Sequence, residues 1–138
     1  MGLIERTVTL TRGAATTGLT DAQLLLSSGV HGGHIRRLTV REDLALDKGT
    51  EATVYVTKVL ADAAHSTTPT GANTVHSVAA VVLAGSATVA SSDEKIVDQK
   101  ASFPQGYDLY IHADITAVGA SAAVQTVLYV TALMALED

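Results

Sequence analysis

The sequence predicts an all-β protein: a jelly-roll-like β-sandwich with Greek-key connections and one short helix near the N-terminus. Hydrophobic residues make up 47% of the 138 residues but aromatic residues only 4%, so the core must consist mainly of Ala, Val and Leu. Segments of alternating polarity, the pattern of half-buried strands, recur along the chain. The turns between them are uneven in length, which favours a Greek-key sandwich over an up-and-down barrel. The length suits a single domain, residues 1–138.

The last apolar stretch, residues 124–136, is expected to be the strand around which the others pack. One of its faces, which includes Leu128, is mostly apolar and would enter the core. The opposite face is only lightly polar, and its large members are Val127, Tyr129 and Leu133. A strand that is apolar on both faces needs cover on both. We therefore predict that these three residues contact another chain.

The N-terminal segment 1–12 should form an edge strand or an arm that reaches a neighbouring molecule. Residues 5–11 alternate in polarity as a strand does. Two apolar residues, Leu3 and Ile4, stand at the start of the segment and are further candidates for a contact between chains. The open edge of a sheet can pair with a strand of another chain, which is the contact that such an arm would make.

Residues 20–29 are predicted to form the single helix, about two turns long. Thr20 is placed to cap its N-terminus, and Gln23 three residues later completes a capping box. Gly29 follows the run of leucines and can end the helix. No other segment of the chain combines such start and stop signals with an apolar run, so the rest is expected to be strands and loops.

The middle of the chain is expected to hold strands separated by turns and by one long loop. In the first of these strands, Ile35 and Thr39 would lie on the face opposite Leu38 and Val40. Asp93-Glu94 should begin a turn. Ser, Thr, Pro and Gly without periodicity predict an exposed loop over residues 61–73, a kind of segment that often carries specific contacts. The expected strands are residues 30–40, 52–60, 75–83 and, as a short edge, 87–90.

The segment 107–115 alternates cleanly and predicts a strand with one polar face. Leu109, Ile111 and their same-parity neighbours would point inward. We expect the other face to lie in solvent, where its polar residues could contact a partner or form part of an acid–base site. An ordinary solvated strand face is the favoured interpretation. The polar residues of this face are Tyr110, His112 and Asp114.

Charge and composition exclude several classes of function. The net charge is −5, and the nine basic residues are scattered, so the chain lacks the clustered basic surface that binds nucleic acid. Without cysteine, no disulfide or thiolate metal site holds the fold. We expect no signal peptide and no membrane span. The mean hydropathy of +0.29 is high for a small monomer, which predicts a homo-oligomer that hides apolar surface between subunits.

The pair His31 and His34, separated by two glycines, is the first candidate for a metal site. Residues three apart on a strand point to opposite faces, so only a loop could bring both imidazoles together, with Glu42 as the nearest third ligand. A glycine-loosened turn with both histidines in solvent is the preferred interpretation. The spacing also departs from the His-x-His and later histidine of the cupin metal site, although Pro104-Gln105-Gly106 resembles its second motif.

Two other groups of polar residues are candidate sites, one around His65 in the long loop and one of three acidic residues. A serine nucleophile needs a strained elbow with oxyanion donors, and the long loop is a poor place to hold one. The acidic group has oxygen ligands for calcium without the spacing of an EF-hand, so a solvated turn is favoured. We therefore predict no catalytic residue, no metal and no cofactor. The first group is His65, Asp62, Ser66 and Ser77, and the second is Asp43, Asp47 and Glu51.

From His34 onward the chain resembles the small jelly-roll decoration, or cement, proteins of tailed-bacteriophage capsids. The likeness lies in His34-Ile35-Arg36-Arg37-Leu38-Thr39-Val40, Ala-Thr-Val-Tyr-Val-Thr, Lys-Ile-Val-Asp, and Phe-Pro-Gln-Gly-Tyr-Asp-Leu-Tyr-Ile-His-Ala-Asp before the closing strand. It implies a non-enzymatic protein, made in the host cytoplasm, that sits on the capsid exterior as a trimer. Such a protein binds the major capsid protein between capsomers and stabilises the head. The alternative is a β-sandwich module that binds carbohydrate or a receptor through residues 61–73 and the Tyr110 face.

Overall fold

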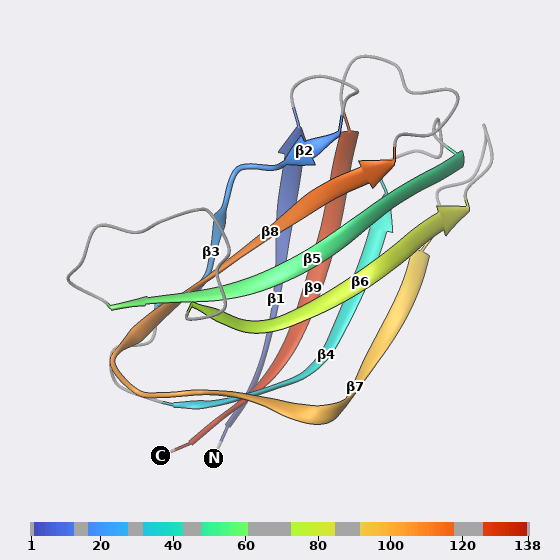
Figure 1. Cartoon of the computed structure of the whole chain (residues 1–138). Coiled ribbons are helices and arrows are strands. Elements are labelled where there is room, and N and C mark those ends of the chain that lie inside the picture. Colours follow the sequence, from blue (N-terminus) through green and yellow to red (C-terminus); the bar gives the residue numbers. More distant parts are fainter. Residues whose placement is uncertain are drawn as a thin grey trace.

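The computed structural model describes residues 2–12, 17–27, 32–42, 48–60, 73–84, 92–117 and 126–137, and within them it contains strands and no helix. The strands follow one another along the chain with short or long connections between them (Figure 1). In order, they are β1 (Gly2–Arg12), β2 (Gly18–Leu19), β3 (Gln23–Ser27), β4 (Gly33–Glu42), β5 (Lys48–Leu60), β6 (Thr74–Ala84), β7 (Ser92–Phe103), β8 (Tyr107–Ala117) and β9 (Thr126–Leu136).

The strands form two antiparallel sheets that pack face to face as a β-sandwich (Figure 1). Sheet A has the order β1-β9-β4-β7, and sheet B has the order β2-β8-β5-β6, with β3 also paired to β8. The chain crosses from one sheet to the other at every connection except those from β2 to β3 and from β5 to β6. The all-β prediction and the prediction of a sandwich are therefore confirmed.

Strand β9 occupies an interior position in sheet A, as expected for the strand around which the others pack. It pairs with β1 along its whole length, from Leu136 opposite Gly2 to Thr126 opposite Arg12, and with β4 on its other side. From Val127 to Met134 its side chains alternate between half-buried and fully buried positions, and Ala135 is buried as well. The buried face contains Leu128, as the alternation predicted. Strand β1 lies at the edge of the sheet.

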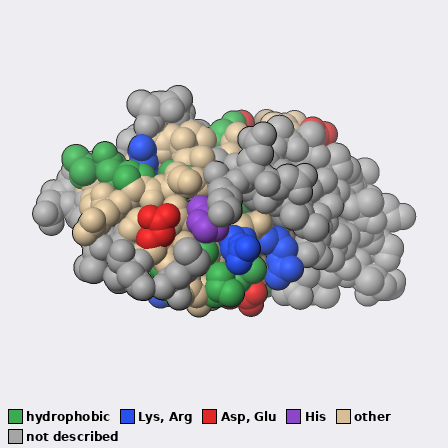
Figure 2. Space-filling view, turned by 90° about the horizontal axis from the view of Figure 1, so that it is seen from below, with side chains coloured by type: hydrophobic (Ala, Val, Ile, Leu, Met, Phe, Trp, Pro, Cys, Tyr) green, Lys and Arg blue, Asp and Glu red, His purple; other side chains and the backbone are tan. Residues whose placement is uncertain are grey.

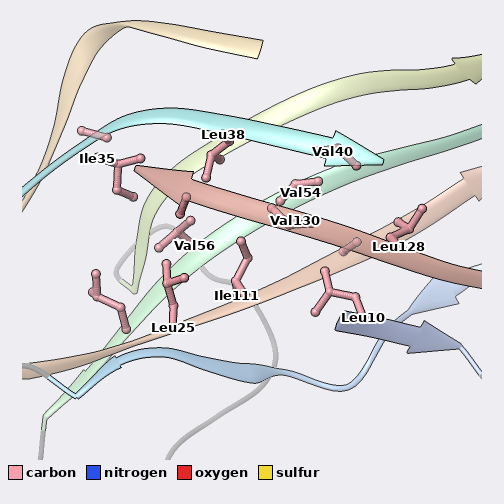
Figure 3. Packing of buried hydrophobic residues seen from close by; sticks show 14 of the residues in the cluster. Leu10, Leu25, Ile35, Leu38, Val40, Val54, Val56, Ile111, Leu128 and Val130 are labelled. Carbon is pink, nitrogen blue, oxygen red and sulfur yellow. The ribbon is translucent and has the colours of Figure 1, made fainter. Parts of the chain in front are cut away.

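The hydrophobic core lies between the two sheets and receives side chains from both (Figure 3). Leu38 and Val130 enter it from sheet A, and Val54 and Ile111 meet them from sheet B. Removing one such side chain from water contributes about 1.5–3 kcal/mol, and with few aromatic residues the core depends on many aliphatic contacts of this kind. The largest fully buried apolar side chains are Leu10, Leu25, Ile35, Leu38, Leu109, Ile111, Ile115, Leu128 and Met134.

A β-bulge at Arg36 changes the alternation that the sequence predicted for β4. The register shifts between Ile35 and Arg37 against both neighbouring strands, β7 and β9. The extra residue, Arg36, is exposed, and the side chains beyond it are displaced by one position. Ile35, Leu38 and Val40 consequently all enter the core. The expectation that Ile35 opposes the other two was wrong, because regular alternation does not continue through a bulge.

The predicted helix over residues 20–29 does not form, and β3 occupies its centre. Thr20 does not cap a helix: its N–H donates to the carbonyl of Ala113 (2.8 Å), and its Oγ1 accepts from the N–H of Ala113 (3.0 Å). Leu25 and Leu26 are both buried at a second bulge in the pairing with β8. The free edge of β8 satisfies these backbone groups, and the core takes both leucines, so tertiary pairing overrides the local helix signal.

Arg12 connects the two sheets at the end of β1. Its Nη1 donates to the carbonyl of Leu19 in β2 (2.9 Å), and its guanidinium lies where a side chain at Gly18 would have to be. Gly18 also has a φ of 132°, which disfavours any other residue. We expect Arg12→Ala to lower the free energy of unfolding by about 1 kcal/mol, measured in urea, through loss of this hydrogen bond. Arg12→Lys should recover little of it, and full recovery would contradict the assigned contact.

Other predicted elements differ at their ends or lie outside the described residues. The predicted turn at Asp93-Glu94 is wrong, because these residues belong to β7, which pairs with β4 there. Asp47 and the predicted short edge over residues 87–90 lie outside the described part, as does the long loop except Asn73. The carbonyl of Asn73 accepts a hydrogen bond from the N–H of Lys58 (2.8 Å). Among the described residues, no helix is long and apolar enough to cross a membrane.

Candidate functional site

The outer face of sheet A carries four of the residues predicted to contact another chain. Because successive side chains alternate across the sheet, Val127, Tyr129 and Leu133 of β9 point away from the core and are half-buried. Leu3 pairs with Ala135 on the same face, and 62% of its surface is exposed. The structure thus brings these four side chains to one outer face.

Charged and threonine side chains surround the apolar residues of this face. Glu5 of β1 and Arg37 of β4 flank Leu133 in one row across three strands. In the next row, the Oγ1 atoms of Thr7 and Thr131 are hydrogen bonded at 2.9 Å. The face is therefore amphipathic, with apolar groups along its centre and an acid and a base on either side. Such a mixture is typical of surfaces that form separable protein–protein contacts.

Ile4 and the remaining predicted contact residues lie elsewhere. Ile4 pairs with Met134 and packs against the core, so its side chain points away from the outer face of sheet A. Tyr110 and His112 belong to β8 and lie on the outer face of sheet B, on the opposite side of the sandwich. The predicted contact residues therefore do not form one surface.

His112 is fully buried, which corrects the expectation that it faces solvent. It stands on the outward parity of β8, but β8 is an interior strand, with β5 on one side and β2 and β3 on the other. Tyr55 of β5 pairs directly with His112, and the two rings stack with centroids 5.7 Å apart and an interplanar angle of 29°. None of the His112 surface is exposed. The sequence pattern gave its parity correctly and its environment wrongly.

The buried polar groups of this face lack hydrogen-bond partners in the described part of the chain. They are Nδ1 and Nε2 of His112 and Oγ1 of Thr57, a second fully buried residue, which pairs with Tyr110. Burial lowers the pKa of His112 below its ordinary value of 6.5, because desolvation disfavours the charged imidazolium. At neutral pH the ring is therefore uncharged.

Half-exposed and exposed residues complete the outer face of sheet B. Tyr55, Tyr110 and Asp114 are half-exposed. Leu24 of β3 pairs with Tyr110, and Leu19 of β2 pairs with Asp114; both leucines are exposed. Sequence reasoning missed Tyr55 and the two leucines as parts of this surface. The alternation of Val54-Tyr55-Val56 gives the outward parity of Tyr55, but only strand pairing places it beside His112.

The other candidate sites are not assembled by the described residues, where no group of three or more His, Asp or Glu side chains could hold a metal. His34 is buried in β4, so the expectation of a solvent-facing turn was wrong at this residue. Its partner His31 lies outside the described residues. Glu42 ends β4, Glu51 is half-buried in β5, and Ser77 is exposed in β6. The described part does not include Asp43, Asp47, Asp62, His65 or Ser66.

Charge on the end of the sandwich near the termini is mixed. In the view from below, acidic, basic and hydrophobic side chains lie side by side on the described residues, with a histidine among them (Figure 2). The fold and these surfaces define a class: an antiparallel two-sheet β-sandwich with one amphipathic outer face and one outer face built around a buried histidine. Comparison with known protein families and with curated proteins finds no match for this chain.

Proposed function

We propose that this protein is a non-enzymatic structural protein of a virion, which decorates the capsid exterior and stabilises the head. The strand order supports a finer description of the sandwich as a jelly roll. Two four-strand layers, β1-β9-β4-β7 and β2/β3-β8-β5-β6, with crossings at nearly every connection, match an eight-strand arrangement of two Greek keys. Viral capsid domains use this architecture, as do lectin domains and cupins, so the fold alone does not select the function.

The observation that carries the proposal is the amphipathic outer face of sheet A. β9 fills the core with one face and presents Val127, Tyr129 and Leu133 on the other. The three strands β1, β9 and β4, with 11 paired residues between β1 and β9, cover roughly 14 by 37 Å, or about 500 Å² per chain. Burial of this face against a different patch of equal size on the next copy removes about 1,000 Å² in total, near the lower limit of a specific interface. We assign this face to contacts between copies of the chain, which we propose form a trimer.

The edge of sheet A supplies a second means of attachment. Strand β1 pairs with β9, and among the described residues it has no strand on its other side. Its remaining backbone N–H and C=O groups are therefore oriented to pair with a strand of the major capsid protein. The protein would stabilise the head by burial of apolar surface on the outer face of sheet A and by backbone hydrogen bonds along β1.

The first experiment is the solution mass by light scattering over a tenfold dilution. We expect a trimer throughout this tenfold range, and we expect Leu133→Asp to convert it to a monomer, because the interface would have to desolvate the added carboxylate, which also lies beside Glu5. Leu24→Asp is the matched control, since Leu24 is equally apolar, is exposed and lies on sheet B. A monomeric wild-type chain, or a trimer that survives Leu133→Asp, would contradict the proposed interface.

Capsid binding is tested separately by cosedimentation with expanded heads of the virus that carries this chain. We expect the wild-type chain to sediment with the heads and to raise the temperature at which they release DNA. The trimer should bind with a stoichiometry of about one trimer per junction between capsomers. The Leu133→Asp monomer should bind at least tenfold more weakly, because it loses multivalency. A trimer that does not sediment with these heads would overturn the decoration function and leave the oligomer intact.

One observation favours a second candidate, a module that binds carbohydrate or a receptor. The half-exposed Tyr55, Tyr110 and Asp114 lie together on the outer face of sheet B, and a tyrosine ring beside a carboxylate can hold a sugar through stacking and hydrogen bonds. A glycan array distinguishes the two functions. Binding that is lost in Tyr110→Ala, without a change in solution mass, would support the module.

A further inference from the structure

His112 lies on β8, an interior strand of sheet B. Its strand, β8, pairs with β5 along nearly its full length and with β2 and β3 on the other side, so β8 holds the sheet together. The side chain lies on the outer face, where solvent normally accepts a polar group, yet none of it is exposed. A change in the charge of this ring therefore acts on the strand that joins the two halves of sheet B.

The surroundings of the ring stabilise only its neutral form. Tyr55 stacks against it from β5, and among the described residues neither ring nitrogen has a hydrogen-bond partner. Thr57, the next outward residue on β5, is also buried with an unpartnered hydroxyl. A protonated imidazole has two N–H donors and a full charge, and in this buried position the described residues offer it no hydrogen-bond acceptor.

The charged and titratable groups around His112 lie at the border of the buried region. On β8 the outward-facing neighbours are Tyr110 and Asp114, one pleat away on either side, followed by Asp108. From β5 the facing titratable group is Tyr55. Strands β2 and β3 contribute the apolar Leu19 and Leu24 in the rows of Asp114 and Tyr110. Between them, Asp21 continues the register of β2 opposite His112, and it is exposed, so its carboxylate retains water. Asp114 is half-exposed and thus retains water around its carboxylate, which weakens its attraction for a buried cation.

We propose that His112 is an acid-sensitive latch of sheet B: when the ring takes up a proton, β8 separates from β5 and the outer face of sheet B opens. The imidazolium can contact water and the carboxylate of Asp114 only if the stack with Tyr55 is broken. Since Tyr55 and His112 are a directly opposed pair, their separation disrupts the β5–β8 ladder at its centre. The latch does not depend on the proposed capsid function, and its failure would leave that proposal untouched.

The sign of the effect follows from linkage. Burial lowers the pKa of His112 in the folded protein below 6.5, the value it has in the unfolded chain. Between these two pKa values the unfolded chain binds more protons, so stability is complete above pH 6.5 and is lost as the pH falls through this window toward the folded value. The unfolded chain sets the limit of this effect: protonation of one histidine with the ordinary pKa of 6.5 can decrease the equilibrium constant for folding by at most about 25-fold between pH 7 and pH 5.

Urea unfolding of the full chain at pH 7, 6 and 5 tests the latch. We expect the folding equilibrium constant of the wild-type protein to decrease several-fold, with about 25-fold as the limit. In His112→Phe, which keeps a ring for the stack with Tyr55 but cannot titrate, this decrease should disappear. His34→Gln removes the other described buried histidine, on sheet A, and should keep the decrease. The same decrease in His112→Phe as in the wild type would overturn the proposal.

Measurements on the wild-type protein keep the latch falsifiable if His112→Phe does not fold. The ring protons of His112 should titrate in NMR spectra with a midpoint below 6.5, and a midpoint at or above 6.5 would contradict the latch. Hydrogen exchange locates the opening: after correction for intrinsic rates, amides of β5 and β8 should lose protection between pH 7 and pH 5 while those of β1 and β9 keep theirs. Unchanged protection of β5 and β8 would also refute it.

Discussion

Replacement of Gly33 by alanine should lower the free energy of unfolding by about 2–4 kcal/mol, the largest effect expected for so small a change. Gly33 is buried at the start of β4, where a Cβ atom would overlap the carbonyl oxygen of Ala135 and lie 3.0 Å from Cζ of Phe103. The carbonyl belongs to the backbone of β9 and cannot move without breaking the sheet. Urea or thermal unfolding of the purified variant measures the effect.

Gly2→Ala is the matched control for Gly33→Ala. A Cβ atom at Gly2 would have no atom within 4 Å, so this variant should unfold within about 0.5 kcal/mol of the wild type. Gly106 has the same open space but a φ of 92°. The loss of stability in Gly106→Ala should therefore lie between those of the other two variants, because only backbone strain opposes the substitution. If Gly33→Ala were as stable as Gly2→Ala, the close packing of β4 on β9 would be wrong.

Truncation of Leu128 to alanine should destabilise the protein by about 2–5 kcal/mol, whereas Leu133→Ala on the same strand should cost less than about 1 kcal/mol. Leu128 is fully buried in the core between the sheets, and its loss leaves a cavity. Leu133 lies on the outer face and is half-buried, so water can replace its side chain. The comparison tests which face of β9 contributes more to the free energy of unfolding.

The two variants should also differ in their effect on association. At concentrations far below the range used for light scattering, where the chain is monomeric, Leu133→Ala should unfold nearly as the wild type does. Its trimer should dissociate at a higher concentration than the wild-type trimer, as measured by sedimentation equilibrium. Leu128→Ala should shift unfolding and leave the trimer contact of the folded chain unchanged. A reversed pattern, with Leu133 essential for the monomer, would mean that the assignment of the two faces is inverted.

Much of the strand content followed from the sequence, because alternation of polarity reports directly on a strand with one buried face. The core face of β9 with Leu128, and the inward positions Leu109 and Ile111 of β8, were predicted correctly. These strands are regular, so their period of two continues without interruption. The outward parity of Val127 and Tyr129 followed from the same pattern, although their role in association is still a prediction.

The errors arose where distant strands decide local structure. Thr20 and Gln23 have the spacing of a helix cap, but the free edge of β8 offers Thr20 backbone partners, and no local signal records this competition. The bulge at Arg36 interrupts the alternation at the adjacent pair Arg36-Arg37, but the polarity pattern does not show which residue is unpaired, and only the register against β7 and β9 does. His112 has the outward parity that predicts solvent exposure. It is nevertheless buried, and one of the groups packed against it is the ring of Tyr55, which comes from another strand.

The sequence by itself determined that this chain is all-β and which face of its regular strands is apolar, because these properties depend on residues two positions apart. The tertiary structure alone decided the order of strands in the two sheets, the burial of His112 and the division of the predicted contact residues between two outer faces. Those features depend on pairings between residues far apart in the chain, such as Thr7 with Thr131, whose register no local pattern encodes.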